Sequence, residues 1–453
     1  MSVWRSALGA CFRRAHCKTR KSTGSMFQVL AHEYKPSPWL QKTFLSPCIK
    51  SMRFYTSSNP DIELCVDKYE CLMDEDIVVK VTGLYPSNRV IVLATTEHNG
   101  NLFWSHGLFR ANGCGVVDLS TDSPISGSYD EADPSGLIWS MVAAPWLPAH
   151  TRMFQPRAIK PRIITFSVFP ESDSPSDYLK DKTKLLASIE HKRWYKSSNT
   201  RRIPIDHPRL QGTVFLPEGC HDDGIFRYRI HYVTTGPGPF PGVIDMYGGL
   251  VTIVEGRAAL LASQGFATLC LSYVHAEGLP QSLLHIELGY FEVIMTQNVT
   301  IHMPLVSFSR IEETGIQLNE EGVSIRDLFV VPDKAYFKPW IHGAHLLTIL
   351  GSDDLMFAVD HTIHLYKDMP QNYYSKKATL VIYPGAGHMI ETPNTPLTRV
   401  LDAFDHLQQG INLQSWKHEQ NNLLLCGGYP KEHAAAQRDA WQRSLNFLRK
   451  HLR

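Results

Sequence analysis

The stretch that decides the fold is residues 241–274, which read PGVIDMYGGLVTIVEGRAALLASQGFATLCLSYV. It predicts a strand at 243–247, a helix at 254–264 that ends at a glycine, and a second strand at 266–273. The second strand is almost continuously apolar, as expected for a strand that is covered on both faces. A strand, a helix and a strand in this order predict a β-α-β unit, so a parallel sheet covered by helices begins here.

Apolar spacing predicts further elements on both sides of this unit. On the C-terminal side we expect a helix at 282–297, two buried strands at 346–350 and 379–383, and an amphipathic helix at 434–451. On the N-terminal side lies a connector at 170–240, rich in charge and proline. It holds a predicted helix near 178–191 and a strand pair at 212–216 and 226–230.

Residues 61–169 have a different pattern, with short apolar runs separated by turn residues such as Asn99-Gly100 and Asn112-Gly113. No stretch of helical periodicity competes with these runs. The pattern predicts an antiparallel β-sandwich, and we place this domain at 61–200 and an α/β domain at 205–453. The predicted strands are 62–66, 77–81, 90–94, 102–104 and 163–166.

The chain has 453 residues and a formal net charge of +1, but its charge is unevenly distributed. Residues 1–60 hold ten Lys and Arg against one acid, Glu33, which leaves 35 bases and 43 acids, a net charge of −8, for the rest. A basic arm that is rich in Ser and Ala and lacks a long apolar core is typical of an organelle transit peptide. We therefore expect a removable arm at 1–53 and a location in the mitochondrial matrix, with the cytoplasm as the alternative. A nucleic-acid-binding arm is disfavoured because the acidic body extends no basic face.

Several classes of protein are disfavoured by what the sequence lacks. The nine cysteines form no C-x-x-C pair, which argues against a disulfide or zinc framework. Two His-x-x-His pairs, His342/His345 and His361/His364, have no third ligand at a useful spacing, so we expect no metal. There is no phosphate-binding loop, no dinucleotide motif and no apolar run long enough to span a membrane. We expect no cofactor and no nucleic-acid partner.

Two turns that follow predicted strands carry residues suited to catalysis. They are Gly351-Ser-Asp-Asp354 and Pro384-Gly-Ala-Gly-His388. In open parallel sheets the ligand crevice lies beyond the carboxyl ends of the strands, so an Asp and a His that leave neighbouring strands can meet there. A His base needs a carboxylate to hold its far ring nitrogen, and the order Asp before His is that of the α/β-hydrolases. Asp353 or Asp354 is then the orienting acid and His388 the general base; the alternative is that all three are solvated loop residues.

The sequence evidence for the other parts of such a site, the oxyanion hole and the nucleophile, is weaker. Gly248 and Gly249 follow the first strand of the β-α-β unit, where an α/β-hydrolase supplies one backbone N–H of its oxyanion hole. The same glycines also suit a plain turn between a strand and a helix. The nucleophile of an α/β-hydrolase lies on a G-x-S-x-G elbow, and no Gly in this chain begins a G-x-[Ser/Cys/Thr]-x-G motif. The sequence therefore supplies a base and an acid without a recognisable nucleophile.

Ordered blocks of sequence resemble a known family. The blocks are GLYP at 83–86, NLFW at 101–104, FRA at 109–111, GLIWSM at 136–141, EHKRWY at 190–195, RLQGTVFLP at 209–217, GPFPGVIDMYG at 238–248, RAALLASQGFA at 257–267, GSDD at 351–354 and YPGAGH at 383–388. Over about residues 62–452 they resemble the acyl-CoA thioesterases and bile acid-CoA:amino acid N-acyltransferases, most of all the mitochondrial thioesterases of that family.

The resemblance implies an N-terminal β-sandwich, a C-terminal α/β-hydrolase domain, and serine-type hydrolysis of a fatty acyl-CoA to a fatty acid and coenzyme A. Coenzyme A then enters only as part of the substrate. The resemblance also implies that Asp354 is the triad acid, through its spacing from His388, with Asp353 as the fallback.

Two departures from the family pattern bear on activity. In the family, the helix before the nucleophile leads into a strand, a Ser or Cys elbow and another helix. Here the predicted helix ends at Gln297, and the chain continues at Asn298 without the strand, elbow and helix that the family has at this point. A unit of roughly 30 residues is therefore missing. Leu250, Val251 and Thr252 also replace glycines near the oxyanion turn. The first hypothesis is an acyl-CoA thioesterase that is inactive in this form. The alternatives are an N-acyltransferase, a non-catalytic acyl-CoA-binding protein and an exon-skipped isoform.

Overall fold

The computed structural model places residues Arg53–Arg453 in one compact unit, which contains every residue described below. The basic arm predicted at 1–53, with its transit-peptide role, lies outside the described residues. The structure describes residues 62–205, 210–219, 240–248, 253–280, 290, 300–302, 310–311, 317–330, 338–402 and 423–452.

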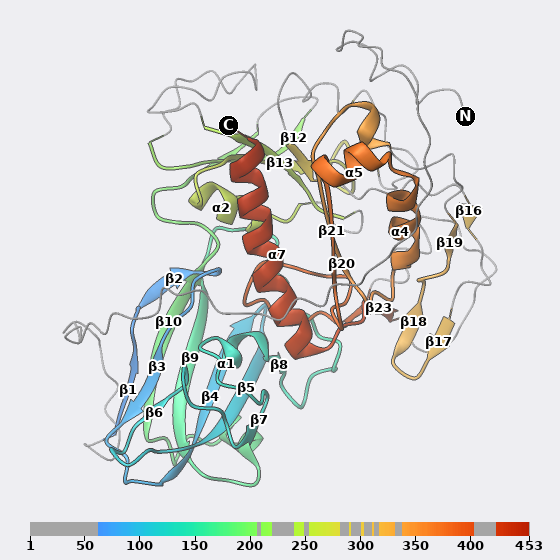
Figure 1. The fold of residues 1–453 in the computed structure, drawn as a ribbon. Coiled ribbons are helices and arrows are strands. Elements are labelled where there is room, and N and C mark those ends of the chain that lie inside the picture. The colour runs from blue at the N-terminus through green and yellow to red at the C-terminus, as the bar shows by residue number, and fades with distance from the viewer. Residues whose placement is uncertain are drawn as a thin grey trace. The chain divides into compact units, whose positions relative to one another are not determined.

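The N-terminal part of this unit forms two sheets (Figure 1). One has the strand order β1-β3-β6, and the other has the order β2-β10-β9-β4-β5-β7, with β8 also paired to β5. Neighbouring strands are antiparallel except β2 and β10, which are parallel. The five strands predicted from the sequence are confirmed as β1, β3, β4, β5 and β9. The bounds are β1 (Glu63–Val66), β2 (Glu70–Leu72), β3 (Val79–Thr82), β4 (Arg89–His98), β5 (Asn101–Arg110), β6 (Val117–Asp118), β7 (Ser126–Gly127), β8 (Val142–Ala143), β9 (Arg162–Pro170) and β10 (Ala187–Trp194).

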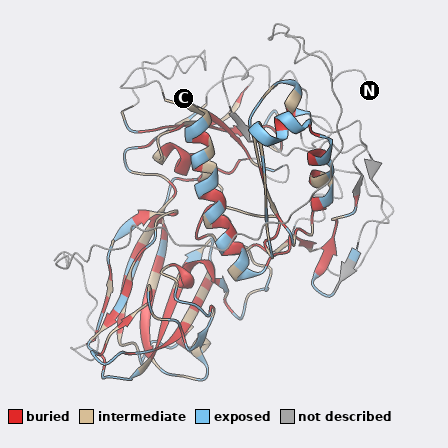
Figure 2. Ribbon diagram, in the orientation of Figure 1, coloured by how far each residue is buried: buried red, intermediate tan, exposed pale blue. Residues whose placement is uncertain are grey.

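The core of this part lies along β4 and β9, which are mostly buried in Figure 2. Ile91 and Leu93 of β4 pack against Leu108 and Phe169 in one cluster. The ring of Tyr178 stacks on Phe169 with 4.2 Å between the ring centroids. Since the residues of β4 that alternate with Ile91 and Leu93 are buried as well, this strand is covered on both faces.

The helix predicted near 178–191 is wrong. The structure has a short 3₁₀ helix, η2 (Pro175–Leu179), and then β10, which begins at Ala187. Along β10 the buried residues are Ala187, Ile189, His191 and Arg193. This is the two-residue period of a strand, and it escapes a search for apolar residues because two of the buried side chains are polar.

The β-α-β unit predicted from residues 241–274 is confirmed as β13 (Gly242–Met246), α2 (Gly256–Ser263) and β14 (Ala267–Ser272). β13 and β14 are parallel neighbours in a sheet of order β11-β12-β14-β13-β15. The other strands are β11 (Arg201–Pro204), β12 (Gln211–Leu216) and β15 (Thr300–His302). The strand predicted at 226–230 and almost all of the helix predicted at 282–297 lie outside the described residues.

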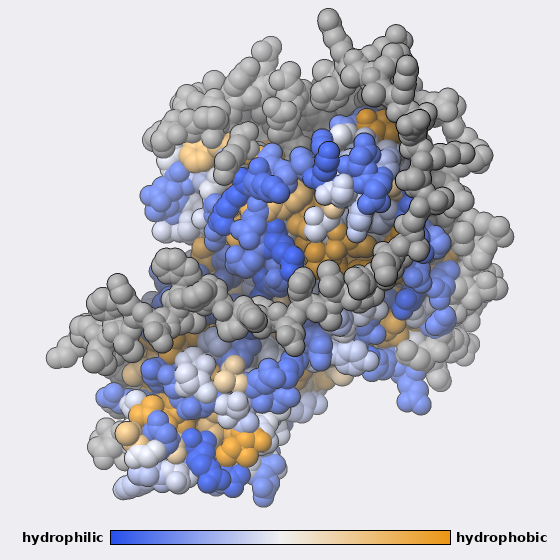
Figure 3. Space-filling view, viewed as in Figure 1, coloured by the Kyte–Doolittle hydropathy of each residue, from blue (hydrophilic) through white to orange (hydrophobic). Residues whose placement is uncertain are grey.

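The strands β20 (Leu346–Gly351) and β21 (Ala378–Tyr383) confirm two further predictions but form a separate two-stranded parallel sheet. The expectation that both are buried is wrong. No residue of β21 is buried, and Ile382 is 36% exposed. In Figure 3 apolar side chains are visible in this region, between the hydrophilic surfaces of α7 and α5. A parallel pair is normally covered on both faces and flanked by further strands, and within the described ranges this pair has no third strand.

The helix α7 (Pro430–His451) confirms the predicted C-terminal helix and connects several parts of the fold. Trp441 and Leu445 pack in one cluster with α2. The indole N–H of Trp441 donates to Asp74 Oδ2 at 2.9 Å, and Arg438 donates to both carboxylate oxygens of Asp133 at 2.7 Å. No helix of the described residues is both long and apolar enough to cross a membrane.

The remaining elements are short. They are α1 (Gly136–Trp139), β16 (Arg310–Ile311), β17 (Gln317–Asn319), β18 (Gly322–Ser324), β19 (Phe329–Val330), η6 (Pro339–Ile341), α4 (Val359–Asp368), α5 (Gln371–Lys377), β22 (Val400–Leu401) and β23 (Leu424–Leu425).

Removing a core side chain from α2 tests this packing. Leu260 is completely buried in the cluster that α2 shares with α7, so Leu260→Ala should lower the free energy of unfolding by roughly 2 to 5 kcal/mol. The matched control is Ile341→Ala, at a side chain that is 66% exposed, where we expect a change within about 0.5 kcal/mol. Urea denaturation of the full chain measures both, and equal effects would contradict the assigned core.

A second test uses pH. His191 is fully buried, with Nδ1 2.9 Å from the carbonyl oxygen of Lys68, and burial together with Arg193 lowers its pKa to about 4. Since the unfolded chain binds this proton below about pH 6.5, the free energy of unfolding should fall between about pH 6.5 and pH 4, by up to roughly 3 kcal/mol. His191→Gln removes this group from the titration. The free energy of unfolding of that variant should therefore depend less steeply on pH. An unchanged pH dependence would show that His191 is not its source.

Candidate active site

The structure brings His388 and Asp354 together beyond the carboxyl ends of β20 and β21. His388 Nδ1 donates to Asp354 Oδ2 at 2.9 Å. Asp354 is only 5% exposed, and its second oxygen accepts the backbone N–H groups of Met356 at 2.8 Å and Phe357 at 2.9 Å. Three hydrogen bonds therefore hold this carboxylate in place, and they fix which ring nitrogen of His388 carries the proton.

Asp353, the fallback acid, has a different position. Its Oδ2 accepts the backbone N–H of Gly428 at 2.7 Å and lies 3.8 Å from a guanidinium nitrogen of Arg399. No hydrogen bond or ion pair within the described part of the chain joins it to His388. The geometry therefore favours Asp354 as the partner of His388 and gives Asp353 a structural task.

The ring of His388 is partly accessible. Its side chain is 28% exposed, and the ring of Phe357 lies 5.1 Å away between centroids. The backbone N–H of His388 donates to the carbonyl oxygen of Cys426 at 2.8 Å. Because Nδ1 is engaged by Asp354, Nε2 is the nitrogen that can take a proton from a reactant. Among the described residues no Ser, Thr or Cys side chain is hydrogen-bonded to it.

The cysteine nearest to this pair along the fold does not replace the missing nucleophile. Cys426 is buried, and burial raises the pKa of its thiol to about 12. Its Sγ lies 3.6 Å from the sulfur of Met356. A thiol in such surroundings stays protonated at neutral pH and is a poor nucleophile.

Three loops meet at the pair, and glycines allow the close approach of their backbones. A Cβ on Gly351 would lie 2.2 Å from the carbonyl oxygen of Ala386, and one on Gly387 would lie 2.3 Å from that of Gly427. Gly427 itself has φ +73°, and a Cβ there would lie 1.8 Å from the carbonyl oxygen of Asp353. Each loop thus needs glycine where it touches the next.

A buried polar network that sequence reasoning missed connects the loop after His388 with the end of β13. The hydroxyl of Tyr247 donates to Glu391, and a guanidinium nitrogen of Arg152 lies 3.6 Å from the same carboxylate. Burial, and then the nearby Glu391, raise the pKa of Tyr247 well above its ordinary value. Nothing in the local pattern around Glu391 marks this contact, because its partners are more than 140 residues away.

The proposed oxyanion glycines are only partly described. Gly248 follows β13 and Tyr247, is exposed, and has open space where a Cβ would stand. Gly249 lies outside the described residues. No contact between described residues joins Gly248 to His388 or Asp354, so the oxyanion role stays a prediction.

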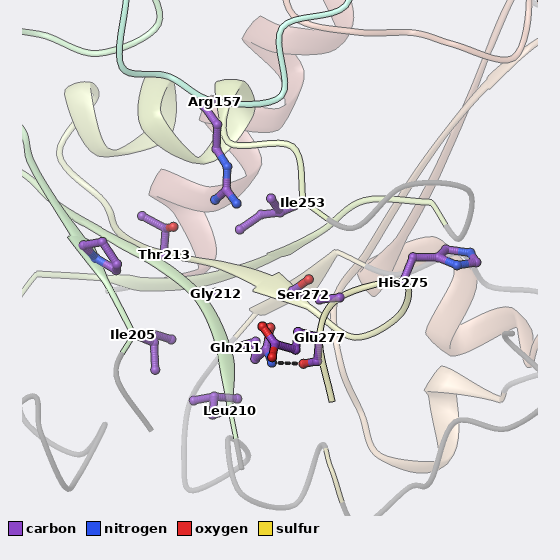
Figure 4. Close-up of a pocket in the computed structure, with 12 residues that line it drawn as sticks. Arg157, Ile205, Leu210, Gln211, Gly212, Thr213, Ile253, Ser272, His275 and Glu277 are labelled. Carbon is purple, nitrogen blue, oxygen red and sulfur yellow. Dashed lines mark hydrogen bonds between the residues drawn. The ribbon is translucent and has the colours of Figure 1, made fainter. Parts of the chain in front are cut away.

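A separate cavity lies away from the His388–Asp354 pair. It has a volume of about 580 Å³, and Figure 4 shows side chains of Arg157, Ile253 and His275 around it. Neither the His388–Asp354 pair nor Gly248 belongs to its lining. A cavity of about 30 Å³ borders Arg152 and Glu391, and that volume is close to the space of one water molecule. Nowhere in the described ranges do three or more potential metal ligands gather.

A His whose ring nitrogen is held by a buried carboxylate after two parallel strands can serve as the acid–base half of a nucleophilic acyl-transfer site. Two family models match the chain: the acyl-CoA thioester hydrolase/BAAT N-terminal region matches residues 74–207, and the BAAT/acyl-CoA thioester hydrolase C-terminal region matches residues 291–453. The chain is 30% identical to mouse bile acid-CoA:amino acid N-acyltransferase, over 84% of this chain and 96% of the relative.

Thioesterases are also similar to this chain. Human acyl-coenzyme A thioesterase 1 is 26% identical over 84% of this chain and 94% of the relative. The human mitochondrial acyl-coenzyme A thioesterase 2 is 26% identical over 84% of this chain and 82% of the relative. The chain belongs to the family of acyl-CoA thioester hydrolases and bile acid-CoA:amino acid N-acyltransferases.

The glycine contacts give a direct test of the site. Gly427→Ala should lower the free energy of unfolding by roughly 2 to 4 kcal/mol, since the residue has a left-handed backbone and its new methyl group would overlap Asp353. Gly242→Ala is the control, because a Cβ there has nothing within 4 Å, and we expect a change below about 1 kcal/mol. Chemical denaturation measures both. A Gly427→Ala variant as stable as the control would show that the loops have room to move apart.

Proposed function

We propose that this chain acts on fatty acyl-CoA thioesters, with His388 as the general base and Asp354 as the acid that orients it. The single observation that carries the proposal is the 2.9 Å hydrogen bond between these residues beyond the ends of adjacent parallel strands. The names of the relatives support the substrate class, because each relative described above is named for a reaction of a coenzyme A thioester. The α/β-hydrolase architecture and the serine-type mechanism are part of the same proposal.

We further propose that the nucleophile unit is absent from this form of the protein. The alignment with the mouse N-acyltransferase is 444 residues long but takes in only 84% of this chain, so part of it is gaps in this chain. β13 pairs directly with β15, which begins three residues after Gln297. Such pairing is what closure of the sheet over a missing strand would give. It supports the absence of a strand, elbow and helix between Gln297 and Asn298.

The missing nucleophile limits what the site does. Removing the nucleophile of a catalytic triad costs on the order of a millionfold in turnover. His388 then has only water to activate, so this form binds acyl-CoA and hydrolyses it very slowly. An exon-skipped isoform of an active enzyme would lack the nucleophile in the same way and would have the same low activity. The transcript sequence across the junction between Gln297 and Asn298 distinguishes such an isoform from a true pseudoenzyme.

N-acyl transfer to an amino acid is the second candidate. One observation favours it: the mouse and human N-acyltransferases are 30% and 29% identical to this chain, and the two human thioesterases are 26% identical. For the location we propose the mitochondrial matrix on the basis of the basic N-terminal arm, and the name of the human mitochondrial acyl-coenzyme A thioesterase 2 places that relative in mitochondria.

Restoring the missing unit tests the proposal. The chain as given should release no free thiol from a long-chain acyl-CoA above the rate of a buffer blank. Insertion of the strand-elbow-helix segment of human acyl-coenzyme A thioesterase 1 between Gln297 and Asn298 should create measurable thioesterase activity, since the base and acid are already in place. The same insertion combined with His388→Ala should abolish the gain.

Three results would contradict this account. Turnover well above the buffer blank by the chain without the insertion, lost in His388→Ala, would show that the site is catalytically competent without the missing unit. Activity of the inserted form that survives His388→Ala would show that His388 is not the base. A folded inserted form, checked by circular dichroism, that binds acyl-CoA and stays inactive would refute the proposed missing unit.

A further inference from the structure

A second histidine, His433, contacts the backbone on both sides of His388. It lies in the first turn of α7 and is only 1% exposed. Its Nδ1 accepts the backbone N–H of Gly387 at 3.1 Å, and its Nε2 donates to the carbonyl oxygen of Met389 at 2.8 Å. One imidazole ring therefore bridges the residue before His388 and the residue after it.

These two hydrogen bonds require a neutral ring with its proton on Nε2. A protonated imidazole has no acceptor for the N–H of Gly387, and the other neutral form has its donor on the wrong nitrogen. Burial lowers the pKa of His433, which keeps the ring neutral at neutral pH. The ring therefore has the one protonation state that serves both neighbours of His388.

The helix holds His433 in place and is tied to the loop at several points. The backbone N–H of His433 donates to the carbonyl oxygen of Tyr429 at 2.8 Å, and the N–H of Tyr429 donates to that of Gly385 at 2.8 Å. The loop is thus tied to the start of α7 at Gly385, Gly387 and Met389. Other hydrogen bonds tie the same stretch to its neighbours: the N–H of His388 donates to Cys426 and the N–H of Asp353 donates to the carbonyl oxygen of Ala386, but neither fixes the backbone on both sides of His388.

We propose that His433 is a positioning residue of the active site. By fixing the backbone on both sides of His388, it aims Nδ1 at Asp354 and leaves Nε2 free for a reactant. This inference rests on the proposed role of His388 as the base, but it concerns the geometry of the pair and not turnover. It can therefore be tested in a chain that lacks its nucleophile.

The test is proton NMR of the full chain labelled with ¹⁵N at its histidines. The imidazole N–H of His388, buried against the Asp354 carboxylate, should give a low-field resonance that exchanges slowly with water. Loss of this resonance in His388→Gln assigns it. If no resonance disappears in that variant, the His388–Asp354 pair does not form in solution, and the proposed function fails with it.

Three substitutions then separate positioning from simple support of the fold. His433→Leu removes both hydrogen bonds at similar size and should abolish the His388 resonance. His433→Asn keeps an oxygen near Gly387, and His433→Gln keeps a donor near Met389, so each should retain a weakened, faster-exchanging resonance. His345→Gln is the control, because the ring of His345 stacks on that of His451 with 3.8 Å between centroids and, among the described residues, makes no hydrogen bond to the site loops. It should leave the resonance unchanged.

The outcome decides the proposal as follows. If His433→Leu folds and keeps the His388 resonance of the parent chain, His433 only stabilises the structure and the inference is wrong. If His433→Leu does not fold, the Asn and Gln variants decide. A parent-like resonance in both would overturn the proposal, and a weakened or lost resonance in either, with a folded spectrum elsewhere, would support it.

Discussion

Gly351, Gly387 and Gly427 let three loops approach one another more closely than any side chain would allow, and the geometry around His388 depends on that approach. The backbones touch where a Cβ would overlap a carbonyl oxygen. The backbone hydrogen bonds that result, from the N–H of His388 to the carbonyl oxygen of Cys426 and from the N–H of Asp353 to that of Ala386, link all three loops. A site built from backbone contacts of this kind is stiff, because none of the partners has rotamers to explore.

The parallel strands of the described residues do not form one continuous sheet. β13 and β15 are direct neighbours, and β20 and β21 stand apart as a pair whose apolar side chains are half-exposed. Exposed apolar strands weaken a fold, since about 25 cal/mol is forgone for every Å² of apolar surface left in water. The contacts of α7 with α2, β20 and β21 compensate in part, because they connect the two sheets without a strand between them.

Local patterns in the sequence predicted much of this fold and the pairing of His388 with Asp354. Apolar periodicity located β13, α2, β14 and α7, and the placement of Asp354 and His388 after neighbouring strands predicted that they could meet. The strand β10 was missed because half of its buried side chains, such as His191 and Arg193, are polar. The exposure of β21 was missed because burial depends on partners that are distant in sequence. His433 and Glu391 were missed for the same reason, since their contacts are set by tertiary structure alone.

The loss of a nucleophile need not dismantle the rest of a catalytic site. Asp354 is held by the N–H groups of Met356 and Phe357, and His388 by Cys426, all of them in the same group of loops. His433 adds a support from α7, whose own anchors are Asp74 and Asp133 in loops of the N-terminal part. None of these contacts passes through the junction at 297–298. The His388–Asp354 pair is therefore held by contacts that do not involve residues near this junction, as expected if the proposed loss of the nucleophile unit leaves the pair intact.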